Sequence, residues 1–350
     1  MKYLITGAAG FIASRTTELL LRQGHEVIGI DNLNEYYDVR LKHYRLSRIA
    51  NENVANPEVR EKLKSAYRSQ SSISIPKFQA GAFSFELLDI ENKPEVLDLF
   101  NRHKFDGVFN LAARAGVRYS MENPDIYMRT NAMGTLNLMD GMKKFGVKKL
   151  VLASTSSLYA GQEMPFTEKL AVNTPISPYA ASKKAAEMLA HSYSYLYEID
   201  VSIVRYFTVF GPCGRPDMCI FRFIKWIDEG TPIELFGDGS QSRDFTFVDD
   251  IAKGTIAALK LVSYEVFNLG GGKNPISLDE IISWIEESLG KQASRLKKPF
   301  HKADIKETWA DISKADRILD WSPKTEVRDG VEQCIQWYLA NRSWLNSVKL

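Results

Sequence analysis

A glycine-rich turn between an apolar strand and a helix restricts the folds open to this chain more than any other feature. A strand is expected at Lys2–Thr6, the turn follows as Gly7-x-x-Gly10-x-x-Ala13, and a helix is expected at Phe11–Arg22. Glycines in such a turn let backbone N–H groups approach a diphosphate at the helix N-terminus. The third position is normally glycine, and Ala13 is the smallest departure from it. The turn therefore predicts a dinucleotide-binding βα unit.

The alternation of short apolar runs and longer helical patterns continues beyond this turn. The strand segments are almost continuously apolar, which is typical of parallel strands covered by helices on both faces. We therefore expect an α/β fold with a doubly wound parallel sheet, the Rossmann arrangement. Candidate strands are residues 2–6, 26–31, 85–89, 107–111, 149–154 and 201–206, and candidate helices are 11–22, 93–102, 127–145 and 179–196.

The second half of the chain is less regular and richer in proline. We expect residues 1–178 to form a cofactor-binding domain, with 201–210 and 246–270 returning to it. Residues 179–350 are expected to form mainly a smaller substrate-binding lobe, with helices at 248–261, 278–289 and 327–339. The polar segment 50–80 is expected to be a partly helical surface excursion with a loop at 69–72.

Composition excludes several classes of protein. The chain has 350 residues, 45% of them hydrophobic, and a net charge of +2, so no global basic field indicates nucleic-acid binding. Its three cysteines form no metal-ligand cluster, so we expect reduced thiols and no metal site. The N-terminal apolar run is too short for a signal peptide, and no apolar stretch approaches the roughly 18 residues that a membrane helix needs. We expect a cytoplasmic protein that does not enter a membrane.

The ends of the other strands complete an expected cofactor cleft, because ligands bind outside the carboxyl ends of parallel strands. The second strand ends in Asp31, about 20 residues after the glycine turn, where a carboxylate accepts hydrogen bonds from the ribose hydroxyls and repels a 2′-phosphate. No arginine follows Asp31 directly, so NAD is favoured over NADP. The other residues expected at the cofactor are Gly7, Gly10, Phe11, Ile12, Asn32, Asp89, Ile90, Leu111, Ala112 and Ala113.

A tyrosine and a lysine four residues apart, Tyr179 and Lys183, are the expected catalytic pair. Ser177 is a suitable N-cap and Pro178 a suitable first residue of a helix, so the pair lies on one helix face. A phenol has a pKa of about 10, and we expect the nearby ammonium and a cationic nicotinamide to lower it, which makes Tyr179 a general base. An ordinary surface pair is the alternative. The hydroxyl run 154–157, at the end of a strand facing the same cleft, favours catalysis.

The glycine turn, the hydroxyl-rich strand end and Tyr-x-x-x-Lys, in this order, resemble the extended short-chain dehydrogenase/reductases, and within them the nucleotide-sugar epimerases. The resemblance implies that Thr155 is the hydroxyl nearest the reacting sugar oxygen, with Ser156 and Ser157 beside it. It also implies that Tyr179 and Lys183 contact the NAD cofactor.

Three longer stretches, residues 31–39, 115–124 and 205–218, resemble the UDP-glucuronate 4-epimerases, and the similarity covers nearly the whole chain. The resemblance implies that Thr208 and Arg215 lie near a uronate carboxylate, Arg118 near the diphosphate, and Arg243 at a second contact to the UDP part. Several arginines suit a substrate with a diphosphate and a carboxylate. Two departures stand out, namely the long segment 50–80 and Arg114, which replaces a neutral polar residue.

The activity implied by the resemblance is NAD-dependent 4-epimerisation of UDP-glucuronate to UDP-galacturonate through a 4-keto intermediate. UDP-glucuronate decarboxylases carry glutamate at the position of Ser157, and 4,6-dehydratases need an acidic pair there, so the serines favour epimerisation. A neutral UDP-hexose 4-epimerase stays open but would not explain Arg215. An NAD-binding scaffold protein is the alternative outside the enzymes, although such proteins often lose the tyrosine or the lysine.

The resemblance also implies a homodimer, because relatives pair two helices per subunit in a four-helix bundle. The candidate helices are 127–145 and 179–196. Met133, Leu136 and Met139 are candidates for the seam of this bundle or, equally, for the core of one subunit.

Overall fold

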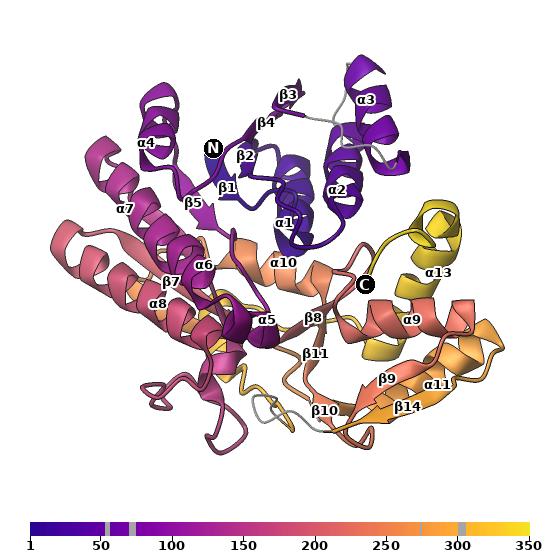
Figure 1. Cartoon of the computed structure of the whole chain (residues 1–350). Helices are drawn as coiled ribbons and strands as arrows, with labels where there is room; N and C mark the ends of the chain where they lie inside the picture. The colour runs from indigo at the N-terminus through magenta and orange to yellow at the C-terminus, as the bar shows by residue number, and fades with distance from the viewer. Residues whose placement is uncertain (53–56, 70–74, 274, 300–305) are drawn as a thin grey trace.

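An eight-stranded sheet with helices on both faces forms the centre of the computed structural model, which describes residues 1–52, 57–69, 75–273, 275–299 and 306–350 (Figure 1). The strand order is β12-β7-β6-β5-β1-β2-β4-β3, and all neighbours pair in parallel except the edge pair β3–β4. The doubly wound parallel sheet is therefore confirmed. The strands are β1 (Lys2–Thr6), β2 (Glu26–Asp31), β3 (Lys77–Ala80), β4 (Phe83–Leu87), β5 (Gly107–Asn110), β6 (Lys149–Thr155), β7 (Asp200–Tyr206) and β12 (Tyr264–Leu269).

Each strand buries alternate side chains on opposite faces of the sheet. In β1, Ile5 packs in the core beneath α1 (Phe11–Arg22) and α10 (Val248–Ala257), whereas Leu4 packs in a second core. The second core lies beneath α4 (Lys93–Arg102), α7 (Gly134–Phe145) and α8 (Pro178–Tyr197). Burial on both faces explains why these strands read as continuous apolar runs rather than alternating ones.

The expected helix 127–145 is interrupted. The short helix α6 (Pro124–Tyr127) leads into a π-helical segment, η1 (Met128–Met133), and only then does α7 begin. The side chain of Asn131 in this segment bonds to both backbone polar groups of Arg114 and to the Ser182 hydroxyl. Hydrophobic periodicity does not reveal such a polar interruption, because η1 depends on partners far away in sequence.

The C-terminal half adds a smaller lobe with its own hydrophobic core. Three strand pairs and three helices build most of it, and it lies at the lower right of Figure 1. The helix α13 runs six residues beyond the expected end at residue 339. The strands are β8 (Thr208–Phe210), β9 (Ile233–Phe236), β10 (Ser242–Arg243), β11 (Phe245–Phe247), β13 (Ile276–Ser277) and β14 (Arg295–Lys298), and the helices α9 (Cys219–Glu229), α11 (Leu278–Leu289) and α13 (Val327–Leu345).

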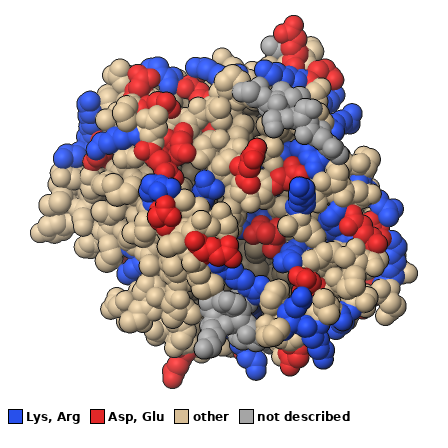
Figure 2. All heavy atoms as spheres, in the orientation of Figure 1, with Lys and Arg blue, Asp and Glu red and all other residues tan. Residues whose placement is uncertain are grey.

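The segment 50–80 packs against this lobe. The end of α2 (Val39–Glu52) is followed by α3 (Pro57–Arg68), where Tyr67 contacts Tyr44 edge-on and Trp344 at a tilt, with ring centroids 5.1 and 5.4 Å away. The partly helical excursion is thus confirmed, while β3 and β12 were not expected. Of the expected loop 69–72, only Ser69 lies within the described residues. Figure 2 shows acidic and basic side chains interspersed over this face, as the small net charge suggests.

Candidate active site

The glycine turn has the geometry of a diphosphate cradle. Gly7 has a φ of +68°, and a Cβ there would lie 2.8 Å from the Cα of Ala112. The N–H of Gly10 donates to the carbonyl of Gly7 at 2.7 Å, and α1 begins at the next residue without a side-chain cap. The first N–H groups of α1 therefore remain available for an anionic ligand.

Asp31 lies at the other end of the same cavity. Its carboxylate is 8% exposed and accepts hydrogen bonds from the N–H groups of Ala9 (3.2 Å) and Leu33 (2.8 Å). The ammonium of Lys42, on α2, lies 3.5 Å from it and lines the cavity. Sequence reasoning missed Lys42, because only the packing of α2 brings it back to the end of β2.

The structure brings the expected cofactor residues together. Their arrangement, with small residues and free N–H groups in the middle and a carboxylate at one end, fits a dinucleotide. A cavity of about 100 Å³ is lined by Gly7, Gly10, Asp31, Asn32, Asp89, Ile90, Leu111, Ala112 and Ala113, and Phe11 and Ile12 line an adjoining cavity of about 440 Å³.

The larger cavity also contains the expected catalytic and substrate residues, with one exception. Arg118 is absent from its lining, and its guanidinium lies 3.8 Å from the ring centroid of Phe236. The residues that do line this cavity are Thr155, Ser156, Ser157, Tyr179, Lys183, Thr208, Arg215 and Arg243.

Tyr179 projects from the first turn of α8, where the Ser177 hydroxyl accepts the N–H of Ala180 at 3.2 Å. Burial raises the pKa of Tyr179, and a hydrogen bond with Thr155 and the charge of Arg215 oppose this rise only in part. In the chain without a dinucleotide burial is therefore the larger effect, and the expected lowering of the phenol pKa by the ammonium and the nicotinamide together stays a prediction.

Lys183 lies one turn further along α8, and its ammonium donates to the carbonyl of Ala153 at 2.9 Å. Burial lowers the pKa of Lys183 to about 8, although the charge of Glu187 acts in the opposite direction. The lysine is thus a cation that the fold holds close to its titration range.

A buried ion pair that sequence reasoning missed supports this helix. The carboxylate of Glu187 accepts two hydrogen bonds from Arg205 (2.9 and 2.7 Å) and one from the Ser154 hydroxyl (2.6 Å). The guanidinium of Arg205 also donates to the hydroxyl of Tyr159 at 2.8 Å. The four-residue spacing from Lys183 to Glu187 was the available signal. The network joins α8 to β6 and β7 directly below the catalytic pair.

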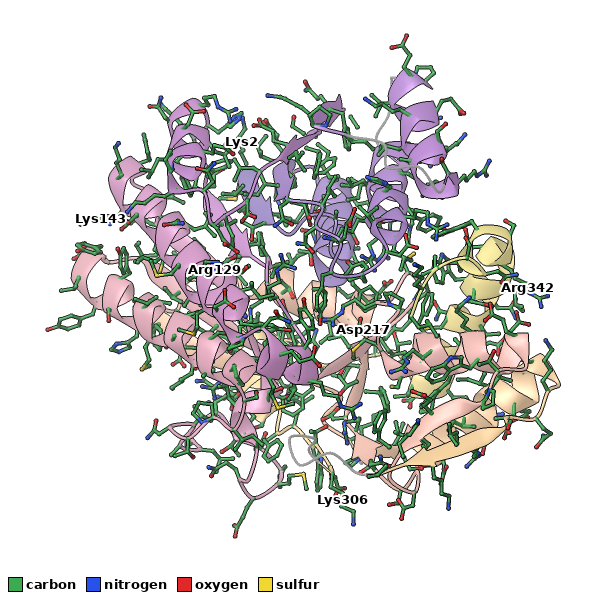
Figure 3. All side chains as sticks on the ribbon, viewed as in Figure 1. Lys2, Arg129, Lys143, Asp217, Lys306 and Arg342 are labelled. Atoms are coloured by element: carbon green, nitrogen blue, oxygen red, sulfur yellow. The ribbon has the colours of Figure 1, made fainter. Side chains whose placement is uncertain are left out.

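Arg215 lies in the loop after β8. Its guanidinium makes a bidentate ion pair with Asp217 (3.0 and 2.5 Å) and lies 5.6 Å from the ring centroid of Tyr36. Asp217 lies near the centre of the face shown in Figure 3. The pair holds the arginine in place and also offsets part of its charge.

Arg243 is fixed by the backbone around it. One of its Nη atoms donates to the carbonyls of Ser242 and Lys306 at 2.8 and 3.0 Å. The neighbouring carboxylate of Asp244 accepts N–H groups from Gly271 and Ala310. Because Asp244 is desolvated by burial, its pKa is raised to about 6.

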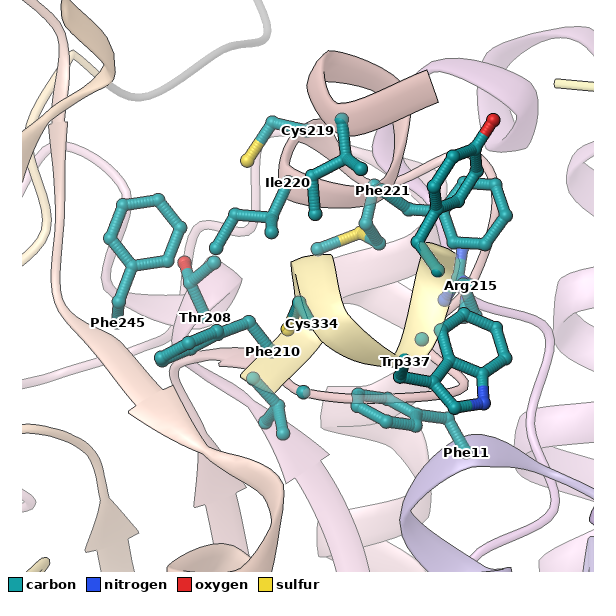
Figure 4. Close-up of a pocket in the computed structure, with 16 residues that line it drawn as sticks. Phe11, Thr208, Phe210, Arg215, Cys219, Ile220, Phe221, Phe245, Cys334 and Trp337 are labelled. Atoms are coloured by element: carbon teal, nitrogen blue, oxygen red, sulfur yellow. The ribbon is translucent and has the colours of Figure 1, made fainter. Parts of the chain in front are cut away.

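Thr208 and Arg215 also border a small pocket lined mostly by apolar side chains (Figure 4). Phe210, Ile220 and Cys334 line its walls. This apolar lining supports β8, which begins at Thr208, and the loop after it, which carries Arg215.

Comparisons with known proteins agree with this geometry. A family model described as the NAD dependent epimerase/dehydratase family matches residues 3–270. A UDP-glucuronate 4-epimerase from Thermodesulfobacterium geofontis is 51% identical over 99% of each chain. The crystal structure of a UDP-glucuronic acid 4-epimerase from Bacillus cereus, with UDP-glucuronic acid and NAD, is 35% identical, with a TM-score of 0.83 over 97% of this chain and 100% of that one. A UDP-glucose 4-epimerase from Thermotoga maritima, with UDP-glucose, is 27% identical, with a TM-score of 0.80 over 98% and 100%.

Proposed function

The chain belongs to the NAD-dependent epimerase/dehydratase family, and we propose that it is an isomerase that interconverts UDP-glucuronate and UDP-galacturonate with NAD as cofactor. The observation that carries this proposal is the single cavity in which Tyr179 and Lys183 meet Thr208 and Arg215. A proton carrier and a partner for a carboxylate thereby face the same bound sugar.

We assign the proton transfer to Tyr179. When bound, NAD takes the hydride from C4 of the sugar and returns it to the opposite face of the 4-keto sugar. The phenol oxygen of Tyr179 accepts the proton of the 4-hydroxyl and gives it back when the hydroxyl is formed again. Thr155 lines the same cavity and opposes the rise in the pKa of Tyr179, so we assign to its hydroxyl the positioning of this oxygen. Lys183 donates one N–H to Ala153, and we assign its other two, which have no recorded acceptor among the described residues, to the cofactor.

A uronate has a hazard that a neutral sugar lacks, because its 4-keto form is a β-keto acid and can lose CO2. The enzyme must keep the C–C bond to the carboxylate out of line with the carbonyl π-system. Arg215 uses its Nε and Nη2 atoms for Asp217, so we assign its Nη1 atom to the substrate carboxylate. Thr208 and Ser157 line the same cavity and complete this contact.

The contacts to the UDP part are proposed more broadly. Arg243 lines the larger cavity, and we assign it to the diphosphate end of the substrate. We also propose that Arg118 contacts the diphosphate. It lies in α5 (Val117–Glu122), next to Val117, which lines the cavity.

We further propose the expected division of the chain, with residues 1–178, 201–210 and 246–270 on the cofactor domain and 179–350 mainly on the substrate lobe. The membership of β7 and β12 in the large sheet supports this division. Nothing in the described part of the chain is a helix long and apolar enough to cross a membrane. All three cysteines are free thiols, which favours a cytoplasmic location.

A homodimer is proposed on the outer face of α7 and α8. Met133 at the end of η1 and Met188 and Leu196 on α8 are 51%, 48% and 61% exposed, and a second copy would bury them. Met139 does not belong to this seam, because it is fully buried in the core of one subunit. Sedimentation that gives a monomer would contradict the proposal.

The function is tested by NMR of the purified protein with UDP-glucuronate, first without added NAD and then with it. We expect UDP-galacturonate without release of CO2. A UDP-pentose would instead favour the decarboxylase. Conversion of UDP-glucose but not of UDP-glucuronate would favour a neutral hexose epimerase. No turnover in either case, with NAD bound, would favour a scaffold protein.

A further inference from the structure

Arg114 is a cation in the cofactor cavity to which the proposed reaction assigns no task. It follows Ala112 and Ala113 and lines the same cavity as Gly7 and Gly10. Its backbone N–H donates to the side chain of Asn131, and its carbonyl accepts from that side chain, both at 2.9 Å. The π-helical segment therefore fixes the main chain from which the Arg114 side chain projects.

The guanidinium of Arg114 is only partly satisfied by the protein. Its Nη1 atom donates to the amide oxygen of Asn34 at 3.2 Å, while its Nε atom is buried without a hydrogen-bond partner. Within the described ranges, its recorded side-chain partner is this neutral amide rather than a carboxylate. A buried cationic donor without an acceptor is unfavourable, so the cavity is complete only when a ligand supplies one.

A chain of hydrogen bonds holds the guanidinium across the cavity. The amide of Asn34 donates to Asn32 at 2.5 Å, and the amide of Asn32 donates to Asp89 at 2.8 Å. The hydroxyl of Tyr36 donates to the carbonyl of Ala115 at 2.5 Å. The loops that follow β2, β4 and β5 are thus tied together around the mouth of the cavity.

We propose that Arg114 binds the diphosphate of the dinucleotide and slows its release. The diphosphate is the anionic part of NAD, and the glycine turn that would cradle it lines the same cavity. The other cation in this cavity, Lys42, is engaged with Asp31. Charge-assisted hydrogen bonds to phosphate are about twice as strong as neutral ones. Because differences in affinity at one site arise mostly from the dissociation rate, losing such a bond should mainly speed the release of NAD.

Slow release suits the proposed reaction, on whose cofactor this inference rests. The epimerisation regenerates NAD in each cycle, so a retained cofactor does not limit turnover. The inference concerns NAD alone and does not depend on which sugar is converted.

The test measures exchange of bound NAD against an excess of isotopically labelled NAD, followed by mass spectrometry of the protein-bound fraction. Arg114→Gln should release NAD about 10- to 100-fold faster than the unsubstituted protein. Raising the ionic strength should speed release in the unsubstituted protein more than in the variant. Arg114→Lys should fall between them.

The matched control is Arg129→Gln. Arg129 lies on the neighbouring π-helical segment, its side chain is 57% exposed, and it pairs with Asp125 and Glu91 at the surface (Figure 3). Its substitution should leave the release rate unchanged.

Competition with ADP-ribose and with adenosine separates the diphosphate contact from a general change in the cavity. Arg114→Gln should weaken ADP-ribose about as much as NAD and leave adenosine unchanged. Equal weakening of adenosine, or unchanged NAD release together with lower stability of the NAD-free protein, would overturn the proposal and leave Arg114 as a structural link to Asn34. Faster NAD release in a protein that does not epimerise UDP-glucuronate would support this inference and refute the proposed function.

Discussion

The two sides of the active site are built in different ways. The cofactor side, formed by the ends of β1, β2, β4 and β5, offers a ligand mainly main-chain N–H groups, small side chains and two carboxylates, Asp31 and Asp89. The substrate side, formed by the short strands that bear Thr208 and Arg243 and the loop that bears Arg215, offers side chains that other groups hold in place. The first side is therefore set by the backbone of the sheet, and the second by ion pairs and loop anchors.

The largest expected effect lies where the two sides meet. Tyr179→Phe should lower the turnover of UDP-glucuronate by about 10²- to 10⁴-fold, because the proton carrier is lost, while bound NAD stays at its normal level. NMR turnover and the NAD content of the purified protein provide the two measurements. Tyr193→Phe, on the same helix but bonded to Asp140, is the control and should stay active. Full activity of the Tyr179 variant would remove this residue from the mechanism.

The second prediction concerns the support that both sides share. Glu187→Gln leaves the guanidinium of Arg205 buried without its counter-charge, so the free energy of unfolding should fall by about 3–5 kcal/mol. Denaturant unfolding measures this loss. Glu287→Gln breaks a pair whose partners are 67% and 60% exposed, and it should cost less than about 1 kcal/mol. Similar losses in both variants would mean that the buried pair has no special role.

A third change addresses the substrate side alone. Arg215→Met should raise the KM for UDP-glucuronate about tenfold or more, since a charge-assisted contact to the carboxylate is lost, while the KM for UDP-glucose stays unchanged. Arg243→Met should weaken both sugars, because both carry the diphosphate. Initial rates with the two substrates separate the cases. If Arg215→Met weakened both sugars equally, the assignment to the carboxylate would be wrong.

The smallest effect is a dependence on pH. The pKa of Lys183 is lowered by burial to about 8, so its charge is present below that pH and lost above it. We expect turnover to fall a few-fold as the pH rises through about 8. In the unfolded chain Lys183 keeps its proton up to its ordinary pKa of about 10.4. The free energy of unfolding should therefore rise as the pH increases from about 8 to about 10.4.

Rates from pH 6 to 10, together with thermal unfolding over the same range, separate titration from unfolding. Loss of activity with unchanged or higher stability is expected. Loss of both together would assign the decline to unfolding instead.

The contrast between the two sides also explains what the sequence could predict. Gly7, Gly10 and Asp31 were recognisable because local turn geometry and the ends of parallel strands determine their positions. The expected cofactor residues line the cavities at this edge as the rule predicts, but Asn34, Lys42 and Thr130 also line them and were not expected. The sequence predicted six of the eight strands of the large sheet and missed β3 and β12.

Contacts that depend on packing account for part of what it missed. Lys42 approaches Asp31 only after α2 has packed, whereas Asp217, two residues from Arg215, was a local signal that the sequence analysis did not use. The pKa of Tyr179 could not be inferred from its spacing to Lys183, because burial opposes the effect of charge. Met139 fits the pattern of an interface as well as that of a core, and only packing distinguishes them.

The aromatic cluster around Tyr67 has a consequence for how the chain is made. Trp344 of α13 packs on Tyr44 and Tyr67, and the Trp337 indole donates to the hydroxyl of Tyr44. A ribosome delivers α2 and α3 long before α13, so their outer face stays uncovered while most of the polypeptide is translated. The glycine turn and the first strands can form early, but α2, which carries Lys42, gains its contacts with α13 only after that helix has been translated.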